Sequence, residues 1–289
     1  MLHFIVNARS GKGLGNKTLK FLCDYCYKNN LPFTAHITAK PNHATDIAKV
    51  LCKNGANTII AVGGDGTFSE VLGGIIDFEK TALGFIPAGR GNDYARATNL
   101  SLKPIKALEM ILKGKTAWSD YIEINNKRCL NIAGSGLDVA VLQRADGKSG
   151  KITYLTSLLY CLKHFEPFKF NISVDGKEKT YHEVITIAVC NGTDFGGGLK
   201  ISPLSKLNDG KMNLVILHMP PDGKIMKALI KFKRVKHLEQ TYVDHILCDS
   251  VVIEPSENNN YSIQLDGEIY KERVLEAKII KSGMRSFVL

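Results

Sequence analysis

A glycine-rich turn between a strand and a helix is the feature that most constrains this chain. Residues Gly63-Gly64-Asp65-Gly66-Thr67 follow Thr58–Val62, which reads as a buried strand, and precede Phe68–Ile76, which reads as a helix. Glycines let a ligand approach the backbone, and the free N–H groups of a helix N-terminus favour negative charge. Asp65 would repel a bare phosphate, but it suits a metal ion that bridges carboxylate and phosphate. The alternative is an ordinary turn.

Strands and helices alternate through the first part of the chain. The expected strands are His3–Asn7, Phe33–Thr38, Thr58–Val62 and Leu83–Ile86, and the expected helices are Thr18–Lys28, His43–Lys53, Phe68–Ile76, Asp93–Asn99 and Pro104–Leu112. This alternation predicts a doubly wound parallel sheet, which binds ligands beyond the carboxyl ends of its strands. Three unusual loops fall there: Asn7–Gly13, Gly63–Thr67 and Pro87–Asp93.

Strands dominate from about Trp118 to Glu276. The expected strands are Tyr121–Asn125, Arg128–Ile132, Lys169–Val174, Tyr181–Cys190, Met212–Met219, His245–Glu254, Tyr261–Asp266 and Val274–Ile280. Two helical patterns, Lys151–His164 and Lys224–His237, interrupt them. The pattern predicts a second, β-rich domain built as an antiparallel sandwich or barrel.

Composition narrows the class of protein. The net charge of +10 suits anionic partners such as nucleic acid, phosphorylated small molecules or an acidic membrane surface, although solubility alone explains it equally well. No apolar run approaches the length of a membrane span, and the N-terminus enters a strand rather than a signal peptide. The seven cysteines are scattered, and the single CxxC, Cys23 and Cys26, lacks a second pair. We therefore expect reduced thiols and a cytoplasmic protein.

Several carboxylates fall at the ends of the expected elements. They are Asp65, Asp93, Asp120, Asp209 and Glu268. If the two domains face each other, these groups would converge, hold Mg²⁺ and accept the proton of an attacking hydroxyl. Plainer roles exist for some: Asn92 or Asp93 as a helix N-cap, Asp120 as a solvated strand end, and the Asp-Gly before Glu268 as a β-turn.

The motifs together resemble the diacylglycerol kinase catalytic family, in its soluble bacterial branch that phosphorylates lipid hydroxyls. Sphingosine and ceramide kinases are relatives, and NAD kinase and phosphofructokinase are more distant ones. The matching segments are Gly63–Thr67 (the family's GGDGT), Pro87–Arg96 (PxGTxNDFAR), Asn131–Asp138 (NGxGxD), Asn191–Gly210 and Leu265–Glu268.

The resemblance implies a nucleotide-binding N-terminal domain, a β-rich lipid-substrate domain and an active site between them. It also implies that the last segment returns to the first domain. The expected limits are residues 1–118 plus 282–289 for the first domain and residues 119–281 for the second, with Ser282–Leu289 as the returning strand.

The resemblance also implies roles for individual residues. The residues that would contact ATP are Asn7, Arg9, Ser10, Gly11, Thr38, Gly63, Gly64, Asp65, Gly66, Thr67, Glu70, Arg90 and Asn92. Glu268 would be the general base, and Asp65 would hold the catalytic Mg²⁺ or help to activate the hydroxyl. Asp93 and Asp120 would join through water. Asp209, with the backbone carbonyls of Lys206 and Lys211, would bind a structural Mg²⁺.

One position departs from the family pattern. The family usually has threonine where this chain has Arg90, so a hydroxyl contact to the nucleotide would become a cationic one. A guanidinium can clamp a phosphate as a fork-shaped donor. The departure puts only this contact in doubt.

The sequence therefore predicts an ATP-dependent lipid kinase, with diacylglycerol as the family's default acceptor and phosphatidic acid as the product. Sphingoid bases, other lipids, polyprenols and NAD are alternative acceptors, and a non-catalytic nucleotide- or lipid-binding regulator is an alternative of another class. Nucleic-acid binding is suggested by charge alone, and no recognised motif supports it.

A lipid kinase has to reach a bilayer without spanning it. Lys224–His237 would form a cationic amphipathic helix, which predicts peripheral association with the anionic inner face of the membrane. The alternative is a helix packed on the sheet with its lysines in water. An edge strand of the second domain could also pair two copies in a homodimer.

Overall fold

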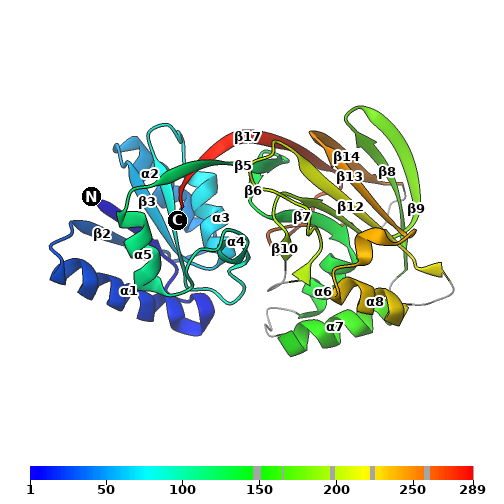
Figure 1. Ribbon diagram of the computed structural model, residues 1–289, viewed down its shortest axis with the longest axis horizontal. Helices are drawn as coiled ribbons and strands as arrows, with labels where there is room; N and C mark the ends of the chain where they lie inside the picture. The colour runs from blue at the N-terminus through cyan, green and yellow to red at the C-terminus, as the bar shows by residue number, and fades with distance from the viewer. Residues whose placement is uncertain (146–150, 165, 196–198, 222–224, 257–260, 289) are drawn as a thin grey trace. The chain divides into compact units, whose positions relative to one another are not determined.

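The computed structural model describes residues 1–145, 151–164, 166–195, 199–221, 225–256 and 261–288. The chain divides into two compact units, Met1–Tyr121 with Lys281–Leu289, and Ile122–Ile280 (Figure 1). Strands β5 (Thr116–Ile124) and β17 (Leu275–Phe287) run through the two boundaries. Gly196–Gly198, Lys224 and Leu289, which belong to predicted segments, lie outside the described residues.

The first unit is an α/β sheet. Its strands follow the order β2-β1-β3-β4-β17, and every pair in this order is parallel. Its elements are β1 (Leu2–Val6), α1 (Ser10–Lys28), β2 (Phe33–Ile37), α2 (His43–Lys53), β3 (Thr58–Gly63), α3 (Asp65–Gly74), β4 (Ala82–Pro87), α4 (Asp93–Ala97) and α5 (Pro104–Leu112). The predicted parallel sheet is confirmed.

Apolar spacing explains which faces of this sheet the helices cover. In α1, Leu22 and Cys26 stand four residues apart and are buried, as an amphipathic helix requires. They share a core cluster with Phe4 and Ile60 of the strands and with Leu108 of α5. Helices α2 and α3 pack against each other, and α2 also packs against β1 and α3 against β3. Three stacked or tilted rings, those of Phe68, Phe85 and Tyr94, tie α3, β4 and α4 together.

The second unit is antiparallel, as predicted. Its remaining elements are β6 (Lys127–Cys129), β7 (Ile132–Gly136), α6 (Leu137–Ala145), α7 (Lys151–His164), β8 (Phe168–Val174), β9 (Lys177–Cys190), β10 (Asp194–Phe195), β11 (Leu199–Lys200), β12 (Met212–His218), α8 (Ile225–Lys233), η2 (His237–Glu239), β13 (Val243–Cys248), β14 (Ser250–Pro255), β15 (Ile263–Leu265) and β16 (Glu268–Tyr270). The long strand β9 pairs with β8 through its first part and with both β7 and β12 through its last part. Its apolar side chains therefore contribute to a core shared by most strands of the unit.

Two predicted strands are wrong because aspartates interrupt them. The segment Arg128–Ile132 divides into β6 and β7, since the Asp266 carboxylate accepts the backbone N–H groups of residues 130, 131 and 132 at 2.8, 2.9 and 3.2 Å. The segment His245–Glu254 divides into β13 and β14, since Asp175 Oδ1 accepts the N–H groups of residues 249 and 250 at 3.0 and 2.8 Å. The N–H groups of Leu130, Asn131 and Asp249 are thereby bound to carboxylates, so they are not available to a strand ladder at the two breaks.

Other elements differ from the prediction in extent. Val274–Ile280 and the returning segment are one continuous strand, β17, and helix α6 was not predicted. The predicted helix Lys224–His237 ends at Lys233 and is followed by the short η2. Helix α1 starts earlier than Thr18, but residues 11 to 13 have left-handed backbone angles, so its regular part follows them. Among the helices described here, none is long and apolar enough to cross a bilayer.

We predict that Asp266→Ala lowers the free energy of unfolding by about 2–4 kcal/mol, because it leaves three backbone N–H groups without their acceptor. Asp266→Asn should cost less, since the amide keeps one acceptor oxygen. Asp24→Ala, at an exposed position of α1, is the matched control and should change the free energy by about 0.5 kcal/mol or less. Urea unfolding measures all three, and equal stabilities for Asp266→Ala and the control would contradict the role of this carboxylate.

Candidate active site

The three glycine-rich loops leave the first unit's sheet at one edge. Val6 stands opposite both Ile37 and Val62, and Gly63 stands opposite Pro87. The segments that follow, starting at Asn7, Thr38, Gly64 and Ala88, therefore begin side by side at the carboxyl ends of the strands. This edge is where doubly wound sheets bind ligands.

Hydrogen bonds tie these loops to one another. Asn7 Nδ2 donates to Thr67 Oγ1 at 3.2 Å, and Ser10 Oγ donates to the Ala88 carbonyl at 3.0 Å. Asn92 closes the third loop on itself, since its side chain accepts from the Gly89 N–H and donates to the Gly89 carbonyl. Asn92 lies at the N-cap of α4 but makes no side-chain capping bond, so that plainer role is wrong.

The second and third loops approach closely at two glycines. A methyl group added at Gly89 would lie 2.3 Å from the Gly64 Cα, a distance that real side chains do not tolerate. The backbones of Gly64 and Gly89 can therefore touch only because both residues lack a side chain. This contact sets the spacing of the two loops.

Two of the predicted metal-binding carboxylates, Asp65 and Asp93, lie close to Gly91 of the third loop. A methyl group at Gly91 would stand 3.2 Å from Asp65 Oδ2 and 3.4 Å from Asp93 Oδ2. The other oxygen of Asp65, Oδ1, accepts the Tyr94 N–H at 3.1 Å. Asp93 is buried at the start of α4, and Asp65 is half-buried at the start of α3. One oxygen of each carboxylate thus faces the same small space, which is open because Gly91 has no side chain.

The other nucleotide-binding candidates are spread over the same edge. Arg9 is exposed, and its N–H donates to Asn7 Oδ1 at 3.2 Å. Thr38 follows β2, and its N–H donates to the Val6 carbonyl. Arg90 is exposed in the third loop. Glu70 has another partner, since its Oε2 accepts the Ala44 N–H at 3.2 Å in the first turn of α2. Their predicted contacts with a nucleotide stay predictions.

Asp120 is buried and has a structural partner. Its Oδ1 accepts the Ser282 N–H at 2.7 Å, at a residue of β17 with a φ of 48°. The carboxylate thereby fixes the returning strand where its backbone departs from regular geometry. The plainer expectation of a solvated strand end is wrong for this residue, and its part in metal binding stays a prediction.

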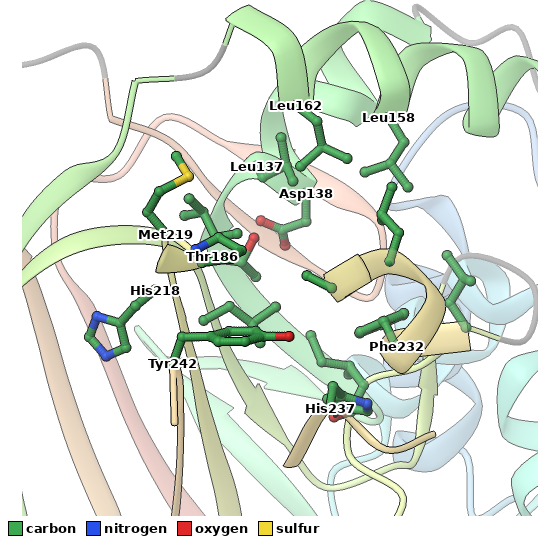
Figure 2. A pocket seen from close by; sticks show the side chains of 17 residues that line it. Leu137, Asp138, Leu158, Leu162, Thr186, His218, Met219, Phe232, His237 and Tyr242 are labelled. Atoms are coloured by element: carbon green, nitrogen blue, oxygen red, sulfur yellow. Dashed lines mark hydrogen bonds between the residues drawn. The ribbon is translucent and has the colours of Figure 1, made fainter. Parts of the chain in front are cut away.

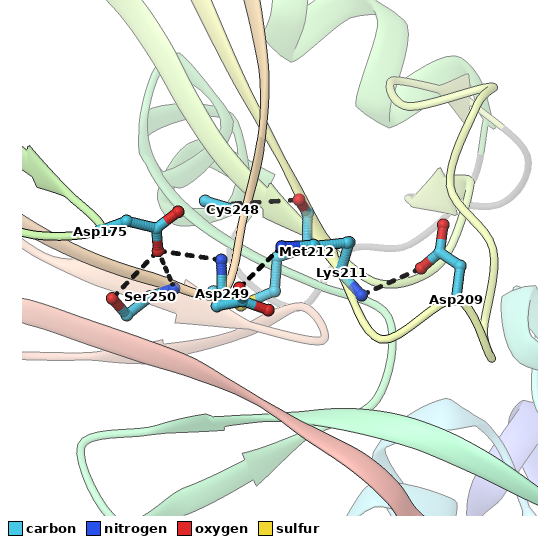
Figure 3. A network of polar contacts seen from close by, with 7 residues as sticks. All are labelled: Asp175, Asp209, Lys211, Met212, Cys248, Asp249 and Ser250. Carbon is cyan, nitrogen blue, oxygen red and sulfur yellow. Dashed lines mark hydrogen bonds and ion pairs between the residues drawn. The ribbon is translucent and has the colours of Figure 1, made fainter.

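The predicted structural metal site lies in the second unit. Asp209 Oδ1 accepts the Lys211 N–H at 3.1 Å, and Lys211 Nζ pairs with Asp249 at 2.7 Å (Figure 3). In the part of the chain that the structure describes, no three His, Cys, Asp or Glu side chains gather as a metal-binding group. A site made of Asp209 and the carbonyls of Lys206 and Lys211 needs only one carboxylate, so it stays a prediction.

Glu268 begins β16 and is exposed. The turn before it consists of Asp266 and Gly267, both with positive φ, which is the two-residue hairpin turn that Asp-Gly favours. The Tyr270 hydroxyl donates to Glu268 Oε2 at 3.1 Å. Burial, with a smaller contribution from Glu268, raises the pKa of Tyr270, so the phenol keeps its proton and remains a donor at neutral pH.

An apolar pocket lies inside the second unit (Figure 2). Most of its lining is aliphatic or aromatic, contributed by α6, α7, α8 and the strands β9 and β12, and it includes Leu137, Leu158, Leu162, Leu217, Leu229 and Phe232. Such a lining suits a hydrocarbon chain and offers little to a polar molecule.

A buried carboxylate in this pocket was not among the predicted site residues. Asp138 is 6% exposed, and its Oδ1 has no hydrogen-bond partner among the described residues. Burial raises the pKa of Asp138 to about 6. Asp138 ends one of the motifs quoted above, but its position at the start of α6 depends on a helix that the sequence pattern did not indicate.

A buried histidine is the second polar group that the sequence did not reveal in this lining. His237 is 2% exposed, and its Nε2 lies 2.8 Å from the Ile201 carbonyl, so Nε2 carries the proton and Nδ1 is left as an acceptor. Nδ1 has no partner among the described residues. Burial lowers the pKa of His237, which keeps the ring neutral.

Known proteins resemble this chain over most of its length. Residues 1–124 match the diacylglycerol kinase catalytic domain, and residues 131–284 match the YegS C-terminal NAD kinase beta sandwich-like domain. A diacylglycerol kinase of Bacillus subtilis (strain 168) is 28% identical over 270 residues, which cover 91% of this chain and 88% of that protein. A probable lipid kinase YegS-like of Enterobacter sp. (strain 638) is 28% identical over 72% of each chain.

Solved structures share the fold. A diacylglycerol kinase from Bacillus anthracis str. Sterne aligns with a TM-score of 0.80 at 22% identity, over 100% of this chain and 96% of that one. An NAD kinase from Archaeoglobus fulgidus in complex with ATP aligns with a TM-score of 0.55 at 12% identity, over 99% and 93% of the two chains.

We predict that Gly89→Ala lowers the free energy of unfolding by about 1–3 kcal/mol, because the new methyl group would overlap the Gly64 backbone. Gly73→Ala is the matched control: it lies in α3, and its added methyl group would meet its nearest neighbour at 3.8 Å. The control should be neutral or stabilising, since alanine favours a helix more than glycine does. Equal melting temperatures for the two variants would show that the loops do not touch at this point.

The Asp138 carboxyl should make stability depend on pH. Because burial raises the pKa of Asp138 to about 6 in the folded chain, above the ordinary aspartate pKa of about 3.9, the protonated group stabilises the fold below about pH 4. That contribution disappears as the pH rises through about 6. Asp138→Asn should therefore match the wild type near pH 4 and exceed it by about 2–3 kcal/mol above pH 7.

Urea unfolding from pH 4 to pH 8 measures this difference. Asp24→Asn serves as the control, since its side chain is exposed on α1. If wild type and Asp138→Asn keep a constant difference over the whole range, the carboxyl does not titrate in this way.

Proposed function

The chain belongs to the diacylglycerol kinase catalytic family, and from this membership we propose that it transfers the γ-phosphoryl group of ATP to the hydroxyl group of a lipid. The observation that carries the proposal is the apolar pocket of the second unit. The other unit of the same chain has three glycine-rich loops of the kind that bind phosphate, at the carboxyl ends of its parallel strands. Diacylglycerol is the acceptor that we place first, with phosphatidic acid as the product.

The loops of the first unit would bind ATP. Their glycines would let a phosphate approach the backbone, and the exposed Arg9 and Arg90 add positive charge to the first and third loops. Asn7, Ser10 and Asn92 fix the loop conformations through the hydrogen bonds described above. A triphosphate would meet a site whose shape is set before it binds.

Mg²⁺ fits the carboxylates beside Gly91. This ion prefers a few carboxylate oxygens together with water and substrate phosphates. Asp65 and Asp93 each turn one oxygen toward Gly91, which leaves room that a side chain would fill. Asp65 would hold the ion, with Asp93 and Asp120 taking part through water. When bound, the ion would offset the negative charge of the phosphates.

Glu268 would act as the general base. Its carboxylate would accept the proton of the lipid hydroxyl as the hydroxyl oxygen bonds to the γ-phosphorus, and the bond to the leaving ADP oxygen breaks with its electron pair. The Tyr270 hydroxyl, which donates to Glu268 Oε2, would hold the carboxylate in one orientation.

The pocket favours a lipid acceptor over a soluble one. NAD carries many polar groups, and the pocket lining has few partners for them: Asp138, Thr186, His218, His237 and Tyr242 stand among aliphatic and aromatic side chains. A sphingoid base or a polyprenol would satisfy the same lining as diacylglycerol. A regulator that binds lipid or nucleotide without catalysis would also use it.

The test is transfer of labelled γ-phosphate from ATP to a panel of lipids and to NAD, in mixed micelles with Mg²⁺. We expect a labelled phospholipid from the wild type and from Glu254→Ala, an exposed strand residue used as the control. Glu268→Ala and Asp65→Ala should each lower the rate by about 100-fold or more, the usual range for a lost catalytic acid or base.

The variants and the panel separate the alternatives. Retained turnover in Glu268→Ala or Asp65→Ala would remove that residue from its proposed role. Labelling of NAD alone would replace the lipid acceptor by a soluble one. Binding of ATP without transfer to any acceptor would indicate a regulator.

A further inference from the structure

Helix α8 presents two different surfaces. Its residues Ala228, Leu229 and Phe232 line the apolar pocket, and Figure 2 shows Phe232 among the lining side chains. Ile230, on the same helix, is 50% exposed, and Val235, in the turn that follows, is 39% exposed. The helix therefore carries apolar side chains both toward the pocket and toward solvent.

The solvent side of this segment is strongly cationic. Its exposed basic side chains are Lys227, Lys231, Lys233, Arg234 and Lys236. No acidic residue occurs between positions 225 and 236. None of the ion pairs found between described residues involves these five side chains. Their charge is available to a partner outside the chain.

Val235 occupies a backbone conformation that its side chain disfavours. Its φ is 59°, and the Lys236 N–H reaches back to the Lys231 carbonyl at 2.9 Å, as at a helix end closed by a left-handed residue. Glycine or asparagine usually takes this position, because a β-branched side chain is strained there. Because this strain and the exposed apolar side chain do not help folding, they point to a role in binding a partner.

We propose that residues 225–236, the docking segment, bind the surface of an anionic lipid bilayer. This inference rests on the proposed function, in which the acceptor is a lipid that has to pass from a bilayer to the pocket behind α8. The basic side chains would meet anionic headgroups, and Ile230 and Val235 would enter the boundary between headgroups and acyl chains. Cations interspersed with apolar groups distinguish such a surface from one for nucleic acid, where stacking aromatic groups would be expected.

The charge of the docking segment is tested with vesicles of phosphatidylcholine containing about one third phosphatidylglycerol. Replacing Lys227, Lys231 and Lys233 by glutamate should weaken binding by about 100-fold, at about fivefold for each lysine. The matched control replaces three exposed lysines of the first unit, Lys20, Lys49 and Lys113, by glutamate, which changes the net charge equally. The control should lose far less affinity, and binding to pure phosphatidylcholine should be weak for all proteins.

Val235→Gly separates docking from folding. Glycine relieves the strained backbone, so the melting temperature should rise by about 2–4 °C, while the loss of the apolar side chain should weaken vesicle binding about fivefold. A residue with only a structural role would change the melting temperature and leave vesicle binding as it was.

Three results would overturn the proposal. They are equal losses of vesicle binding in the two lysine triples, wild-type vesicle binding by Val235→Gly, and binding to RNA in place of vesicles. None of these measurements needs ATP or phosphoryl transfer. If transfer to lipids fails while vesicle binding follows the expected order, the proposed function fails and the docking segment stands.

Discussion

Carboxylates that accept backbone N–H groups from distant segments hold this structure together. Asp266 takes donors from residues 130 to 132, Asp175 from residues 249 and 250, Asp120 from Ser282 and Asp65 from Tyr94. A charged acceptor makes a stronger bond than a carbonyl does, and removing it leaves several donors unsatisfied. Two of these contacts lie beside proposed catalytic groups, since Asp65 is itself one and Asp266 stands in the turn before Glu268.

Hydrogen bonds of the same kind also orient the proposed catalytic groups. Asp65 uses one oxygen to bind the start of α4 and turns the other toward Gly91, so the structural contact would also orient the group that we propose as a metal ligand. Asp266 holds the hairpin turn next to Glu268 against the start of β7. Geometry fixed by such contacts costs nothing to organise at the moment of reaction. A carboxylate with a structural partner is therefore compatible with the role that we propose for its second oxygen.

Local signals predicted the first unit well, since the sequence carries them within a few residues. Helix α5 begins at Pro104, a favoured first helical residue, and α2 has the predicted bounds. The broken strands and the pocket carboxylate needed long-range information. Asp266 lies over a hundred residues from the backbone whose N–H groups it accepts, and Asp138 lines the pocket at the start of α6, where no helix was predicted. Sequence spacing alone contains neither fact.

Helix α8 couples two properties that are usually tested separately. Because Phe232 lines the pocket while Ile230 and Lys231 beside it are exposed, a change in the middle of the helix would alter both the pocket and the surface that we propose binds a bilayer. Val235 lies beyond the helix and outside the pocket lining. The effect of Val235→Gly on vesicle binding therefore depends on the exposed surface and not on the pocket. Because glycine relieves the strained backbone, this substitution should raise stability while it weakens vesicle binding. A loss of packing in the pocket would lower stability instead.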